Sequence, residues 1–75
     1  MGRTEFLGQL AEILEVDSVD ENFDLNGKWD SLVVLSAIAA IDEQYGVTVE
    51  VRQLVETKSV GEVLALIERS GGRTE

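Results

Sequence analysis

The sequence contains no cysteine and no histidine. Without cysteine, neither a disulfide framework nor a thiolate zinc site can support the fold. The absence of both residue types also removes the usual general base and the best nucleophile of enzymes. A serine–lysine pair needs a desolvated amine, whereas Lys28, close to Ser31 in the sequence, lies among acids in an expected loop. No carboxylates have the spacing of a calcium-binding loop. We therefore expect neither catalysis nor a metal site.

Positive charge and long apolar segments are scarce as well. Six basic residues stand against fifteen acids, which gives a formal net charge of -9 at pH 7. Such a chain is a poor partner for nucleic acid and for anionic membranes. No apolar stretch reaches the roughly 18 residues of a membrane span, and no secretory signal is recognisable, so we expect a cytoplasmic location. The acids either keep a small domain soluble or form a surface for basic partners.

The 75 residues are 44% hydrophobic, with only four aromatic side chains among them. This composition suits one small helical domain near the lower limit for independent folding. We predict an all-α, monomeric four-helix bundle with three longer helices and a short third one. The single domain is expected to take in residues 1–75, with its core over 4–69 and a frayed tail over 70–75.

The first half of the chain changes character at residue 17. Apolar residues at intervals of three, four and seven predict a first helix over residues 4–16, with Thr4 as its cap. Residues 17–29 lose this spacing and are rich in acids, so we expect a long loop that Phe23 and Leu25 hold against the core.

A second helix is predicted from Asp30 or Ser31 to Tyr45, where Gly46 can end it in a left-handed conformation. Apolar residues extend beyond one face of this helix, so we expect it to be covered on nearly every side. Its buried stripe is expected to consist of Leu32, Leu35, Ile38, Ala39, Ile41 and Tyr45.

Two further helices are predicted after Gly46. Residues 50–56 form a short helix in this interpretation, because an isolated strand would leave its backbone groups unpaired. The last helix is predicted to begin at Ser59, with Glu62 in capping-box spacing, and to end at Gly71.

The motif Asp30-Ser31-Leu32 stands at the start of the long second helix, after an acidic loop, in a small acidic four-helix chain. In this arrangement the chain resembles an acyl carrier protein from the first helix to the fourth. The resemblance continues through IDEQYG (residues 41–46), VTVEVRQLVETKSV (47–60) and VGEVLALIE (60–68). It implies a non-catalytic carrier whose Ser31 receives phosphopantetheine from coenzyme A through a separate phosphopantetheinyl transferase.

By its position alone, a serine that opens a helix is most often a cap. Asp30 fits that role equally well, however. If Asp30 caps the helix, Ser31 lies in the first turn with its hydroxyl facing solvent, near the positive end of the helix dipole and the free N–H groups. The terminal thiol of the attached arm would also supply the thioester chemistry that a chain without cysteine lacks.

The resemblance further implies that an acyl chain can enter between the second and third helices. The lining by sequence match would be Leu35, Ala39, Val49, Leu54 and Val63. These residues have an alternative role as ordinary core residues that pack against one another.

The implied partners are the transferase and the acyl-loading, condensing and acyl-transfer enzymes. The residues expected to meet them are Trp29, Val33, Ser36, Asp42 and Glu43. Carriers of fatty acid synthesis usually have acids soon after the serine, whereas this chain has Val33 and Ser36 there and acids only at 42 and 43. Trp29 is also unusual before the aspartate, and either packs the loop or shields the base of the arm.

These departures favour a specialised pathway that makes a polyketide, a nonribosomal peptide or a modified lipid. Two alternatives stay open. A peptidyl or aminoacyl carrier would have the same modification and a similarly weakly acidic second helix. An unmodified acidic helical adaptor would explain the composition without any role for Ser31.

Overall fold

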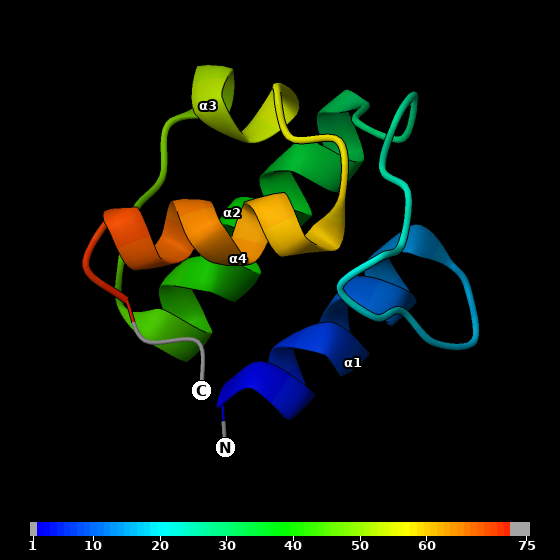
Figure 1. Ribbon diagram of the computed structural model, residues 1–75, viewed down its shortest axis with the longest axis horizontal. Coiled ribbons are helices and arrows are strands. Elements are labelled where there is room, and N and C mark those ends of the chain that lie inside the picture. The colour runs from blue at the N-terminus through cyan, green and yellow to red at the C-terminus, as the bar shows by residue number, and fades with distance from the viewer. Residues whose placement is uncertain (1, 73–75) are drawn as a thin grey trace.

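The computed structural model describes residues 2–72 of the 75-residue chain. The elements are α1 (Gly2–Leu14), α2 (Ser31–Tyr45), α3 (Val51–Val55) and α4 (Val60–Arg69) (Figure 1). Over the described range the only sheet-like pairing is an isolated antiparallel bridge between Asp24 and Ser59. The predicted all-α bundle with a short third helix is confirmed.

The helices surround one apolar core. α1 packs along α2, and α3 contacts both α2 and α4. In Figure 1, α4 crosses in front of α2, and α3 lies at the end of the molecule where α2 begins. The core draws on every helix and on the loop residues Leu25 and Val49, and its buried members are Phe6, Leu10, Leu25, Val34, Ala37, Ala40, Ile41, Val49, Leu54, Val60, Val63, Leu64, Leu66 and Ile67.

The face of α2 that enters the core differs from the predicted stripe. Ile41 is fully buried as expected, but Leu32 is 73% exposed and Leu35 is 64% exposed. The buried positions are Val34, Ala37, Ala40 and Ile41. Because α2 is apolar on several faces, periodicity did not identify the buried one, which includes the small residues Ala37 and Ala40. The expectation that α2 is covered on nearly every side is therefore wrong at its first two turns.

The boundaries of α1 also differ from the prediction. The helix begins at Gly2, so Thr4 lies inside the first turn and is not the cap. It ends at Leu14, and Glu15 follows in a left-handed conformation with φ 61°. The N–H of Val16 then donates to the carbonyl of Ala11 at 2.9 Å, which closes the helix end in the manner of a Schellman motif.

The predicted end of α2 and start of α4 are confirmed. Gly46 has φ 69° and donates its N–H to the Asp42 carbonyl at 2.8 Å. Ser59 caps α4 by accepting a hydrogen bond from the Glu62 N–H at 3.3 Å. The Glu62 carboxylate accepts from the N–H of Lys58 at 2.9 Å, one residue earlier than in the usual capping box.

The C-terminal end of α4 is Arg69, two residues before the predicted Gly71. The amide groups of residues 70–72 donate to carbonyls in its last turn, and the bond from Gly72 to Ile67 measures 2.9 Å. Part of the expected frayed tail, residues 73–75, lies outside the described residues. No helix within residues 2–72 is long and apolar enough to span a membrane.

The loop between α1 and α2 is held at several points, which fixes the start of α2. Leu25 is fully buried, and Phe23 packs partly buried against the core, as predicted. The Leu25 N–H donates to the Lys58 carbonyl at 2.9 Å, and the Phe23 carbonyl accepts from Val60 at 3.1 Å. The loop therefore runs alongside the link between α3 and α4 before α2 begins.

Candidate functional site

The candidate site is the N-terminal turn of α2. Asp30 precedes the helix with an extended backbone, and its Oδ1 accepts a hydrogen bond from the Val33 N–H at 2.8 Å. Its carbonyl accepts a hydrogen bond from the Val34 N–H at 2.9 Å, so both the side chain and the backbone of Asp30 accept from the first turn of α2. Ser31 is the first helical residue, and its side chain is exposed. The expectation that Asp30 caps the helix while Ser31 occupies its first turn is confirmed.

An open hollow of about 400 Å³ lies beside Ser31, between α2 and α3. We call it the α2–α3 hollow. It is lined by Trp29, Asp30, Ser31, Val34, Leu35, Val51 and Val55. Leu35 is 64% exposed, Val51 is 51% exposed and Val55 is 41% exposed, so much of this apolar lining faces solvent. Asp30 contributes the one charged side chain among these described lining residues, and it is already engaged in capping.

Trp29 forms one side of the α2–α3 hollow. Its indole Nε1–H donates to the Thr57 carbonyl at 3.0 Å, and the half-buried ring packs against the core. Thr57 is itself buried, and its Oγ1 donates to the Leu54 carbonyl at 2.6 Å. Trp29 thus connects the loop before α2 to the end of α3. Of the two roles that the sequence left open for Trp29, packing of the loop is observed, and shielding of the arm stays a prediction.

The five residues predicted to line an acyl chain do not share one surface. Leu35 lies in the α2–α3 hollow. Val49 is 3% exposed, and Leu54 and Val63 are fully buried within the core. Ala39 is exposed and borders a groove between α1 and α2. Only Leu35 of this set is therefore next to Ser31 in the described structure.

The residues predicted to meet partners are divided between several surfaces of α2. Val33 is half-buried and borders an open hollow on the α1 side, together with Leu32. Ser36 shares the α1–α2 groove with Glu43, whose carboxylate accepts a hydrogen bond from Gln9 at 3.2 Å. Asp42 is exposed on the last turns of α2, whereas Trp29 lines the α2–α3 hollow.

Three lining residues of the α2–α3 hollow were not identified from the sequence as site residues: Val34, Val51 and Val55. Val51 and Val55 are four residues apart, so they lie on the same face of α3. Leu54 already gives this short helix its buried anchor. The sequence did contain a signal for this surface. A helix of five residues buries one face through Leu54, so the valines at 51 and 55 on another face were candidates for exposed apolar residues.

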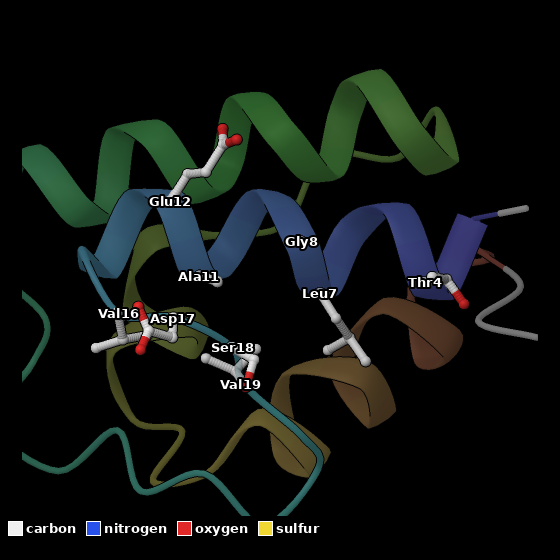
Figure 2. A pocket seen from close by; sticks show the side chains of 9 residues that line it. All are labelled: Thr4, Leu7, Gly8, Ala11, Glu12, Val16, Asp17, Ser18 and Val19. Atoms are coloured by element: carbon white, nitrogen blue, oxygen red, sulfur yellow. The ribbon is translucent and has the colours of Figure 1, made fainter.

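A hollow of similar size lies elsewhere, along α1 and the segment 16–19 (Figure 2). It measures about 420 Å³, and Leu7 of α1 is one of the residues that line it. Gly8 contributes no side chain, while Glu12 and Asp17 place acids at the border. None of the predicted site residues lines it. Within residues 2–72, no three His, Cys, Asp or Glu side chains are grouped so that they could hold a metal ion.

The geometry at Ser31 fits a covalently attached group, because an exposed hydroxyl at a helix start borders open space. The family model described as "Phosphopantetheine attachment site" matches residues 4–67, which include all of α2 and α3. Searches of curated proteins and of solved structures found no match. The chain therefore belongs to the phosphopantetheine-attachment family, and it is a carrier protein with phosphopantetheine as its prosthetic group.

Proposed function

We propose that Ser31 holds the phosphopantetheine group and that the chain carries acyl intermediates as thioesters on it. The exposed position of Ser31 at the first residue of α2, inside the span that matches the family, is the observation that carries this proposal. Asp30 performs the capping, so the Ser31 hydroxyl is not needed for that task. Asp30 and Leu32 complete the motif on either side of the modified residue.

The electrostatics of the α2 start support the attachment of an anion. The first-turn N–H groups carry partial positive charge, and no acidic residue lies within that turn. A phosphodiester at an exposed helix start gains ~0.3–1 kcal/mol from this field. That contribution eases attachment without driving it. When bound, the group supplies a thiol for thioester formation, which a chain without cysteine does not offer.

The surface around Ser31 supports a specialised pathway that makes a polyketide, a nonribosomal peptide or a modified lipid, and we propose that the chain works in the cytoplasm. Leu32 and Leu35 are exposed there, and the acids Asp42 and Glu43 come only in the last turns of α2. Apolar contacts at an interface strengthen binding to a matching apolar partner, whereas charges at its border mainly raise the encounter rate. A peptidyl or aminoacyl carrier is the alternative, because the same weakly acidic helix suits it.

The attachment is tested by incubating the protein with coenzyme A, magnesium and a promiscuous phosphopantetheinyl transferase. The wild type should gain the mass of one phosphopantetheine group, and Ser31→Ala should gain none. Ser36→Ala is the matched control, since it removes a hydroxyl five residues later on the same helix. Ser31 is exposed, so its truncation leaves the core intact. A folded wild type that stays unmodified contradicts the proposal and favours an unmodified adaptor.

The pathway proposal is tested by adding the missing acids. Val33→Glu with Ser36→Glu should raise kcat/KM with an elongation enzyme of fatty acid synthesis, measured on the modified protein at fixed ionic strength. Ala65→Glu with Ser70→Glu adds the same charge at exposed positions on α4 and just after it, outside the hollows that border Val33 and Ser36, and should change little. Equal gains from both variants would show that total charge, not the surface of α2, sets the rate.

A further inference from the structure

One hollow of the protein has no connection with Ser31. It is the hollow of about 420 Å³ along α1 and residues 16–19, which we call the Leu7 hollow (Figure 2). Among the described residues, none from α2 or α3 lines it, and its lining shares no residue with the two hollows that border the start of α2. The attachment of phosphopantetheine therefore assigns no role to this surface.

The Leu7 hollow has an aliphatic lining that the fold itself holds in place. Leu7 and Val19 are partly buried and pack against the core, and Ala11 is 5% exposed. Val16 is 36% exposed, and its N–H donates to the Ala11 carbonyl at 2.9 Å, which keeps residue 16 beside α1. The hollow thus presents apolar surface in a preformed shape to a group from outside.

Gly8 keeps the hollow open at a cost to α1. A Cβ at this position would meet nothing within 4 Å, and the residue lies inside the helix without a positive φ, so neither a close contact nor the backbone requires glycine. Glycine inside a helix is less favourable than alanine. A side chain at position 8 would, however, occupy part of the hollow that Gly8 lines. The choice of glycine therefore fits a surface against which another molecule packs.

The charges around the Leu7 hollow limit what can bind there. Its two charged lining residues, Glu12 and Asp17, are both acids, and no base is found among the described ones. The chain as a whole has a net charge of -9. A second copy of the chain, an anionic lipid surface or an acidic peptide would therefore bring like charges together. An apolar side chain accompanied by a lysine or arginine matches both the aliphatic lining and the acids.

We propose that the Leu7 hollow is a docking site for a partner protein, which inserts one large apolar side chain next to a lysine or arginine. The apolar side chain packs over Gly8 against Leu7 and Val16, and the basic group is attracted to Asp17. This site goes beyond the proposed carrier function and does not depend on the attachment at Ser31. A partner bound in the Leu7 hollow leaves the start of α2 free, so it can stay bound while the arm serves a second enzyme.

The test is a titration of the ¹⁵N-labelled full chain with three tripeptides blocked at both ends: Lys-Phe-Lys, Lys-Ser-Lys and Glu-Phe-Glu. Lys-Phe-Lys should shift the amide signals of Gly8 and Val16 in a saturable manner. Lys-Ser-Lys lacks the apolar ring and should bind about tenfold more weakly. Glu-Phe-Glu keeps the ring but is repelled by the acids, so it should also bind more weakly.

Three outcomes of this titration overturn the proposal. The absence of any shift at Gly8 and Val16 shows that the hollow does not take the apolar side chain. Equal affinities for Lys-Phe-Lys and Lys-Ser-Lys show that charge alone drives the binding. Equal affinities for Lys-Phe-Lys and Glu-Phe-Glu show that the partner needs no basic group.

Val16→Ser and Val55→Ser provide a matched pair that tests the location. The two valines are 36% and 41% exposed, but only Val16 lines the Leu7 hollow. Val16→Ser should weaken the binding of Lys-Phe-Lys, and Val55→Ser should leave it unchanged. Equal weakening in the two variants contradicts docking in the Leu7 hollow. A dimer in sedimentation that Val16→Ser dissociates would identify a second copy as the occupant and overturn the proposal.

Gly8→Gln separates binding from stability. Glutamine is the better helix former, so the variant should have a higher Tm than the wild type, while its side chain at the hollow should weaken the binding of Lys-Phe-Lys. A merely structural role of position 8 would not give a more stable protein that binds less well. Wild-type affinity in a Gly8→Gln variant of raised Tm contradicts the docking site.

The transferase reaction distinguishes this inference from the proposed function. Gly8→Gln and Val16→Ser should take up phosphopantetheine at the wild-type rate, because neither residue borders Ser31. A wild type that is modified but does not bind Lys-Phe-Lys refutes the docking site alone. A wild type that binds Lys-Phe-Lys but takes up no phosphopantetheine refutes the carrier function alone.

Discussion

Replacement of Asp30 by alanine should destabilise the protein through the loss of one hydrogen bond. The Asp30 carboxylate accepts from the Val33 N–H at 2.8 Å, with good cap geometry at φ -105° and ψ 178°. Alanine offers no acceptor, and loss of such a cap costs about 1 kcal/mol. In a domain of this size that corresponds to a fall in Tm of about 4–8 °C. Water can replace the carboxylate in part, because the position is exposed.

Asp30→Asn separates the hydrogen bond from the charge. The asparagine side-chain oxygen can accept from the same N–H, so this variant loses only the attraction of a negative charge to the helix start. We expect the stability order wild type, Asn, Ala, measured by thermal and urea unfolding. Ser59→Ala, which removes the equivalent cap of α4, is a control of similar size.

Amide hydrogen exchange makes the test local. Asp30→Ala should speed the exchange of the Val33 amide, while the Glu62 amide, which Ser59 caps, should exchange as in the wild type. An unchanged Tm together with unchanged exchange at Val33 would refute the reasoning. Equal losses for alanine and asparagine would show that the charge, and not the hydrogen bond, stabilises this turn.

Three further outcomes are expected. Glu15→Gly should raise the free energy of unfolding by about 0.7 kcal/mol, because glycine adopts the left-handed φ of 61° without the steric cost. Urea unfolding measures this gain, and the control Glu15→Gln should show a smaller one. Burial raises the pKa of Tyr45 above 10.0, although the positive charge of Arg3 acts in the opposite direction. The protonated Tyr45 side chain therefore contributes fully to stability below pH 10, and this contribution is lost as the pH rises through the raised pKa. Alkaline unfolding of wild type and Tyr45→Phe checks this, since the phenylalanine variant should lack that loss. Added salt should raise Tm by screening the net charge of -9, and a flat or falling Tm would show that the acids are already well paired.

The helix ends that depend on local chemistry were predictable from the sequence. Asp30, Gly46 and Ser59 perform the capping roles assigned to them, because a side-chain acceptor or a left-handed glycine acts within one turn of its own position. The end of α1 was less clear, since Glu15 occupies a left-handed position that the sequence does not mark with glycine. The surrounding fold, and not the residue type, determines the left-handed conformation of Glu15.

The orientation of α2 was not predictable by the same means. Several of its faces are apolar, and the packing of the other elements around α2 selects the buried one, which includes Ala37 and Ala40. That choice leaves Leu32 and Leu35 exposed and creates the apolar surface around Ser31. Ser31, in contrast, was identifiable from the sequence, because the motif Asp30-Ser31-Leu32 stands at the start of the predicted second helix. The lining of the α2–α3 hollow depends on how α3 packs over α2, which local spacing does not encode.

Fragmentation mass spectrometry of the modified wild-type protein tests the attachment at Ser31 most directly. The chain has five serines, and the nearest alternative on the same helix is Ser36. The added mass of phosphopantetheine is predicted on every fragment that contains Ser31 and on no fragment that lacks it. Localisation of that mass to any of the other four serines would contradict the assignment of the start of α2 as the carrier site.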